Sequence, residues 1–313
     1  MSNIILLFLC LFLGFFLRKT KLFPENGHLA LNSFVINISL SALSLYYIPK
    51  ITLNLQVIFP VMVPWINIGL AILFFTFLGK KMNWPKTLIG ALIMCAGFGN
   101  TSFVGIPVIQ SLYGESGLKT VMLVDQPGSF VALSTLGITI ASFYSGEKIA
   151  ISEIIKKIFK FPPFIAFCVA VLLNIFNVNI PLQIDDVFAK LGATTVPLAM
   201  VSVGSQLRWQ KLDHDAKPLF WALLFKLILF PTVIFILYFL ILKQRGEMIE
   251  VAFLESAMGP MVTAAIIAAA HKLEPKLCNL ILGVGIPLSL VTLTICYLLM
   301  KYSGVLEMYI FQI

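Results

Sequence analysis

Long apolar stretches constrain this chain more than any other feature. A helix needs about 20 mostly apolar residues to cross the hydrocarbon core of a membrane. A window of that length predicts spans over residues 3–17, 28–48, 57–79, 86–112, 118–143, 162–179, 186–207, 218–242, 248–271 and 277–300. These ten spans use almost the whole chain. We therefore expect an all-α polytopic membrane protein without a soluble domain.

The composition excludes most other classes of protein. Apolar residues make up 59% of the 313 residues, and charged residues only 12%, whereas soluble domains have about 25% charged residues. A soluble, disordered or nucleic-acid-binding protein is thereby excluded. The five cysteines lie inside apolar stretches without metal-like spacing, so we expect neither a disulfide framework nor a metal or other cofactor.

The positions of Lys and Arg predict the orientation in the membrane. The loops after the first, third, fifth, seventh and ninth spans hold 15 of the 22 cations, and the opposite loops hold five. Cytoplasmic loops carry the excess of Lys and Arg, so we expect both termini outside. The basic segment 147–160 also contains apolar residues. It is interpreted as a helix lying on the inner membrane face, with a solvated linker as the alternative.

The number of spans indicates an internal repeat. Five spans followed by five make the second half start on the opposite side of the membrane, as in an inverted-topology repeat. We place the first repeat at 1–143, a short cytoplasmic linker at 144–161 and the second repeat at 162–313. Segments 127–134 and 287–294 match at four of eight positions, although chance among apolar helices is an alternative explanation.

The fourth predicted span of each half is interrupted. Residues 97–107 contain three glycines, a proline and three hydrogen-bonding side chains, and residues 255–260 end in Gly259-Pro260. Because Pro and Gly are poor helix formers, we expect each span to split into two half-helices. Unwound backbone at membrane depth must be buried or line a cavity. Two matched breaks indicate a transporter binding site, and simple proline kinks are the alternative.

The breaks also suggest the chemistry of the ligand. We expect Pro107 and Pro260 in the first turn of an outgoing half-helix, with free N–H groups and partial positive charge facing the gap. Asn100 and Thr101 are placed to hydrogen-bond a carboxylate, so an organic anion is the predicted substrate. The candidate substrate-binding residues are Asn100, Thr101, Gly105, Pro107, Gly259, Pro260 and Thr263.

Charged side chains deep in the membrane are costly and often functional. Asp125, next to Gln126, is the first candidate for a proton-coupling carboxylate, because burial favours its protonated form. A carboxylate held permanently by hydrogen bonds is the alternative. Lys226 is expected to pair with Glu255, either as a structural clamp or as a mobile gate. The coupling or gating candidates are therefore Asp125, Gln126, Glu255 and Lys226.

The segment from Asn100 to Pro107 resembles the Asn-Thr-x-x-x-Gly-x-Pro crossover of the auxin efflux carrier family, which is related in fold to bile acid sodium symporters. Segments 124–129 and 286–290 support the resemblance. It implies a 5 + 5 inverted repeat in which broken helices 4 and 9 cross. Helices 3–5 and 8–10 would form a transport domain, and helices 1, 2, 6 and 7 a scaffold. It further implies a bacterial cytoplasmic (inner) membrane protein and, as in several members, a homodimer.

The chain departs from the family pattern at three points. Ser41 stands where proline is usual, Gly259 stands where many relatives have methionine, and the central loop is short. The first departure predicts a straighter second helix, and the second leaves the geometry of the second break open. Because many plant carriers have a long loop there, auxin itself is not the expected substrate.

These observations predict a secondary transporter that moves a mono- or dicarboxylate by alternating access. A coupled proton or sodium ion and the lipid bilayer are the other expected partners. A passive anion channel or a ligand sensor on the same fold is the alternative. An enzyme is not expected, because an intramembrane aspartyl protease needs two deep aspartates and a zinc protease needs a His-Glu-x-x-His motif, and this sequence has neither.

Overall fold

A computed structural model describes residues 2–20, 24, 26–52, 54–146, 155, 159–206 and 216–310. These residues are helical apart from short connections and one isolated antiparallel bridge. Six helices among them are long and apolar enough to cross a membrane, and two shorter apolar helices cover Lys86–Gly97 and Pro162–Ile175. The predicted all-α class is therefore confirmed, whereas the 5 + 5 repeat stays a prediction. The predicted segment 147–160 lies almost wholly outside the described residues.

The first half of the chain forms helices interrupted by wider π-helical turns and by two short 3-10 helices, η2 and η3. Its elements are α1 (Ser2–Lys19), α2 (Gly27–Phe34), η1 (Val35–Ser39), α3 (Leu40–Tyr47), η2 (Ile48–Lys50), η3 (Leu55–Val57), α4 (Ile58–Lys81), α5 (Lys86–Gly97), η4 (Thr101–Gly105), α6 (Ile106–Leu123), η5 (Val124–Phe130), η6 (Leu133–Gly137) and α7 (Ile138–Ser145). Gly114 interrupts α6 with a φ of 66°, a value that glycine adopts easily. This turn separates the fourth predicted span from the fifth.

The second half has a similar series of elements. They are α9 (Pro162–Ile175), α10 (Leu182–Ala193), α11 (Thr195–Gln206), α12 (Ala216–Leu224), η7 (Phe225–Leu229), α13 (Phe230–Phe235), η8 (Ile236–Ile241), α14 (Glu247–Ser256), α15 (Val262–Ala270) and α16 (Pro275–Ile310). Pro231 follows the π-helical turn η7, and Pro127 lies inside η5. A wider turn is one way in which a helix accommodates the donor that proline lacks.

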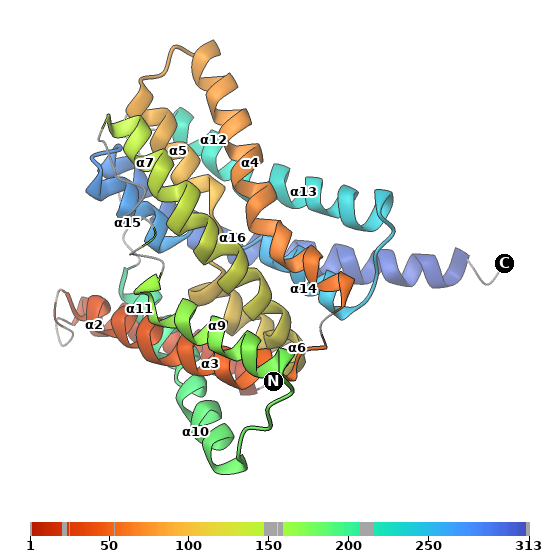
Figure 1. The fold of residues 1–313 in the computed structure, drawn as a ribbon. Coiled ribbons are helices and arrows are strands. Elements are labelled where there is room, and N and C mark those ends of the chain that lie inside the picture. Colours follow the sequence, from red (N-terminus) through yellow and green to blue (C-terminus); the bar gives the residue numbers. More distant parts are fainter. Residues whose placement is uncertain are drawn as a thin grey trace.

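The helices gather into two groups. The first group, which we call the α1–α11 group, contains α1, α2, α3, α9, α10 and α11, with α1 packed along the length of α11. The second group, the α4–α16 group, contains α4 to α7 and α12 to α16, and its centre includes Phe75, Leu92 and Phe230. Figure 1 shows α2, α3, α9, α10 and α11 below α4, α5, α12 and α13. The two groups meet where α11 contacts η4 and α9 contacts η5.

Candidate functional site

The two predicted helix breaks lie against each other. The first separates α5 from η4 at residues 98–100, and the second separates α14 from α15 at residues 257–261. The Asn100 N–H donates to the Gly259 carbonyl at 2.8 Å, and the Met261 N–H donates to the Phe98 carbonyl at 3.1 Å. These bonds supply partners for backbone groups that both helices leave free, as burial within a membrane requires. We call this pairing the crossover.

The start of each outgoing half-helix differs from the sequence prediction. Pro107 does lie in the first turn of α6, but η4 precedes it, so the winding begins at Thr101. Asn100 caps this end and accepts a hydrogen bond from the Phe103 N–H at 3.2 Å. Pro260 lies before Met261, the cap of α15, and is not in the first turn. The first free N–H groups near the gap are therefore those that follow the caps Asn100 and Met261, and the prolines do not determine their position.

Small residues allow the second break to lie close to α16. A Cβ atom added to Gly259 would lie 2.7 Å from Ser289 Oγ, and one added to Gly285 would lie 2.7 Å from Pro260 Cγ. Such distances are shorter than van der Waals contact, so a side chain at either position would push the break away from α16. Gly259 and Pro260 therefore act as packing residues of the crossover in this structure.

Asp125 is the centre of a buried hydrogen-bond network beside the first break. Only 2% of the residue is exposed. Its carboxylate accepts hydrogen bonds from Thr101 Oγ1 at 2.6 Å, from Gln126 Nε2 at 2.8 Å, and from the Ser102 hydroxyl. Thr101 thus donates to Asp125 and is not free to donate to a substrate. These three hydrogen bonds are what the alternative of a carboxylate held by hydrogen bonds requires.

Lys226 and Glu255 lie at the second break, but not as the expected ion pair. Lys226 Nζ donates to the Ser256 carbonyl at 2.9 Å, and no salt bridge of the described residues joins it to Glu255. Both carboxylate oxygens of Glu255 are buried without a hydrogen-bond partner within the described residues. The broken helix explains the difference, because the end of α14 offers Lys226 a free carbonyl that an intact helix would have used.

A cavity of about 110 Å³ lies beside the crossover, between the two helix groups. Side chains of η1 and α3, together with Phe161, line it on one side, and η4, η5, η6, α7 and α15 line it on the other. The rings of Phe130 and Phe161 stack across the boundary between the groups, with centroids 3.7 Å apart. The polar residues of its wall are Ser102, Asp125, Gln126, Ser134 and Thr263.

The cavity contains only some of the predicted site residues. Thr263, Asp125 and Gln126 line it, whereas Asn100, Thr101, Gly105, Pro107, Gly259 and Pro260 do not. Ser102, Ser134, Phe130 and Phe161 were not predicted. Ser102 lies within the predicted break, so its hydroxyl could have been included. Nothing in the local sequence indicates Phe161, because its contact with Phe130 comes from the folding of one half onto the other.

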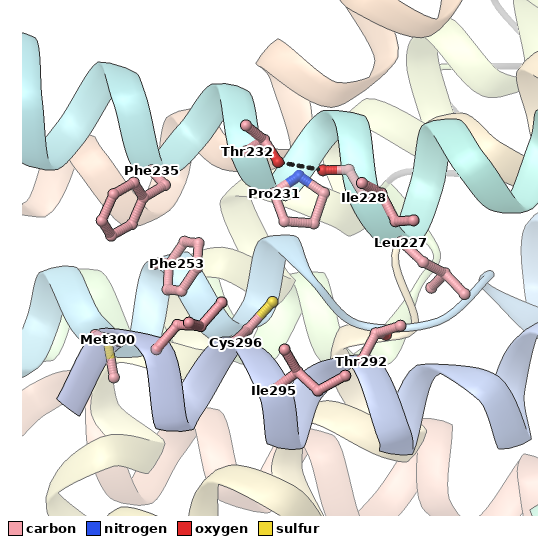
Figure 2. A pocket seen from close by; sticks show the side chains of 11 residues that line it. Leu227, Ile228, Pro231, Thr232, Phe235, Phe253, Thr292, Ile295, Cys296 and Met300 are labelled. Carbon is pink, nitrogen blue, oxygen red and sulfur yellow. Dashed lines mark hydrogen bonds between the residues drawn. The ribbon is translucent and has the colours of Figure 1, made fainter. Parts of the chain in front are cut away.

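A larger pocket is unsuited to an anion. It has a volume of about 490 Å³ and lies between the η7–α13 region, α14 and α16 (Figure 2). Its lining is apolar except for two threonines, and both hydroxyls already donate to carbonyls of their own helix, Thr232 to Ile228 at 2.7 Å and Thr292 to Ser289 at 3.2 Å. Ile228 and Ile295 are about half exposed, so the pocket opens on the outer surface of the bundle.

Comparisons with known proteins identify the family of the chain. The sequence model of a family described as Membrane transport protein matches residues 1–297. The chain belongs to this family. The match confirms the resemblance to the auxin efflux carrier family, and it makes the protein a multi-pass member of a family of membrane transporters.

Several relatives in the family are similar over most of their length. The uncharacterized transporter MJ1031 of Methanocaldococcus jannaschii is 28% identical over 289 residues, which is 88% of this chain and 91% of the relative. An uncharacterized transporter of Methanothermobacter thermautotrophicus is 26% identical, over 90% of this chain and 92% of its own. The uncharacterized transporter YfdV of Escherichia coli K12 is 24% identical, over 88% and 89%.

Proposed function

We propose that this protein is a secondary transporter that moves a small organic anion, a mono- or dicarboxylate, by alternating access. The observation that carries the proposal is the cavity beside two crossed, broken helices, at the boundary between two helix groups. A ligand there would contact both groups at once, so sliding one group past the other would expose it first on one side and then on the other. Membership of a transporter family supports the same conclusion.

We assign one helix group to the scaffold and the other to the transport domain that moves against it. The α1–α11 group would be the scaffold, and the α4–α16 group, which contains both breaks, would be the transport domain. Residues 1–143 and 162–313 would form the two inverted repeats, in which α5 and α14 are the corresponding halves before each break. The cation distribution supports an orientation with both termini outside, and the family resemblance suggests a bacterial cytoplasmic membrane.

The proposed anion site uses neutral donors. Asn100 does not line the cavity, but its Nδ2 is buried at the adjacent break without a hydrogen-bond partner in the described part of the chain. Thr263 and Ser134 bring hydroxyl groups to the cavity, and the donors of Ser102 and Gln126 in its wall are directed to the Asp125 carboxylate. Typical pockets for drug-sized ligands have volumes of about 300–1,000 Å³, so a cavity of about 110 Å³ favours an acid of a few carbon atoms.

Counterflow in liposomes tests this function. Purified protein is reconstituted into liposomes loaded with unlabelled acetate, lactate, malonate or succinate, and entry of the labelled acid is measured. A carrier exchanges at least one of these acids without net current, whereas ohmic conduction would indicate a channel. Thr263→Val should weaken apparent affinity by about 0.5–1.5 kcal/mol, the contribution of a typical hydrogen bond. Thr232→Val, in the apolar pocket, is the matched control, and exchange of none of the acids would contradict the proposal.

A further inference from the structure

Three buried charged side chains surround the crossover. Asp125 is 2% exposed, and Lys226 and Glu255 are each 1% exposed. Two carboxylates and one ammonium group leave one net negative charge when all three are ionised. A bound organic anion would add a second negative charge inside a region of low dielectric, where repulsion between like charges is strong. The anion therefore requires a positive charge to enter with it.

The two carboxylates are not equally able to supply this charge by taking up a proton. Asp125 accepts hydrogen bonds from three donors, and these stabilise its ionised form. Glu255 accepts no hydrogen bond from the described residues at either oxygen. A buried carboxylate without donors is more stable when neutral. Glu255 is accordingly the carboxylate whose surroundings favour the uptake of a proton.

Two of the three glycines around the first break, Gly99 and Gly105, make room for the charged groups of the second. A Cβ atom on Gly105 would lie 2.5 Å from Glu255 Oε1, and one on Gly99 would lie 3.2 Å from Lys226 Nζ. Lys226 also donates to the Ser256 carbonyl at the end of α14, where the helix carries partial negative charge. The ammonium group thus already supplies a fixed positive charge at the crossover.

Other polar and charged groups near α14 contact Glu250, which lies closer to the start of the helix. Tyr113 from α6 and Lys301 from α16 both contact Glu250, at 2.8 Å and 2.9 Å. The charged groups that act on Glu255 are Lys226 from η7 and Asp125 from η5. Protonation of Glu255 therefore changes the charge at the crossover without disturbing the pair formed by Glu250 and Lys301.

We infer that Glu255 carries the proton that is coupled to anion transport, and that Lys226 serves as a built-in cation that makes transport independent of sodium. This inference rests on the proposed function. With a proton on Glu255 and a monovalent anion bound, the site has the same net charge as when it is empty and deprotonated. The proton and the anion therefore cross together, and the proton leaves Glu255 when the anion leaves the cavity.

Infrared difference spectroscopy tests the proton site without any substrate. Purified protein is titrated from mildly acidic to alkaline pH, and the carbonyl band of a protonated carboxyl group is followed. The band should be present in the wild type and in Asp125→Asn, and it should be lost in Glu255→Gln. Glu250→Gln, on the same helix, is the matched control. If Glu255→Gln does not fold, Glu255→Asp should shift the band instead. A band that survives in Glu255→Gln or disappears in Asp125→Asn would overturn the inference.

Transport measurements test the coupling. With one proton per monovalent anion, a pH difference of one unit stores about 1.4 kcal/mol and should accumulate the anion about tenfold. Wild type and Glu250→Gln should reach this level, with sodium or with choline as the external cation, and Glu255→Gln should not. Accumulation that requires sodium would refute the inference. If no acid exchanges in counterflow, the proposed function fails, whereas the infrared band still decides whether Glu255 binds the proton.

Discussion

Glycine has opposite uses in two regions of this molecule. Where α1 packs along α11, a Cβ atom on Gly14 would overlap the Val201 carbonyl, and one on Gly204 would overlap the Leu11 carbonyl. The glycines there let two backbones touch. At the crossover, Gly99 and Gly105 instead face Lys226 and Glu255. The same residue type thus makes a rigid contact in one place and a space for buried charge in the other.

The two regions also differ in what they contribute to stability. Close packing of small residues is a main source of helix association in membranes, so the α1–α11 contact stabilises the fold. Buried charges at the crossover are costly and are retained where they serve function. Substitutions in the first region should therefore affect folding, and substitutions in the second should mainly affect transport.

The largest effect is expected at the backbone contact. Gly204→Val would place side-chain atoms against the backbone of α1, which cannot move as a side chain can. We expect a loss of about 3 kcal/mol or more of folding free energy, measured as loss of monodisperse protein in fluorescence-detected size-exclusion chromatography. Gly69→Val is the matched control, because a Cβ atom on Gly69 meets nothing within 4 Å. If Gly204→Val and Gly69→Val gave the same elution profile, the close backbone contact at Gly204 would not be important for folding.

The next effect is expected at the crossover. Gly105→Ala displaces the Glu255 carboxylate, which lies at the end of a side chain and can shift without unfolding the protein. Overpacking of this kind costs about 1–3 kcal/mol. We expect anion uptake to fall about tenfold to a hundredfold while the elution profile stays normal, with Gly69→Ala as control. If Gly105→Ala failed to fold, Gly105 would be required for folding, as we expect for Gly14 and Gly204.

A smaller effect is expected for the network around Asp125. Thr101→Val removes one of its three donors, and a hydrogen bond to a charged group contributes about 1.5–3 kcal/mol. The melting temperature should fall by more than in Thr135→Val, which loses only bonds to the backbone carbonyls of Val131 and Ala132. Unchanged stability, with loss of substrate affinity, would mean that Thr101 binds substrate directly.

The smallest effect is expected at the end of α14. Lys301 and Glu250 form an ion pair at 2.9 Å, but their side chains are 47% and 27% exposed, and such pairs contribute about 0–1 kcal/mol. Lys301→Met should change the melting temperature little, and less at high salt than at low salt. A larger loss than that of Thr101→Val would show that charge near α14 is important for stability as well as for transport.

The sequence predicts the helix breaks well because their causes are local. Glycine and proline disfavour the interior of a helix and here they are clustered, so residues 97–107 and 255–260 could be recognised without a structure. The partners of the polar groups are not local. Lys226 binds a carbonyl that exists as a free acceptor only because α14 ends at Ser256. Thr101, which looked available for an anion, donates to a carboxylate 24 residues away.

The backbone bonds of the crossover also constrain how the protein is made. Phe98 and Asn100 are synthesised about 160 residues before Gly259 and Met261, the residues that pair with their backbone groups. A backbone group without a partner is costly inside a membrane. The first break therefore cannot reach its final form until the second has been inserted, and the two halves of the chain must complete their folding together.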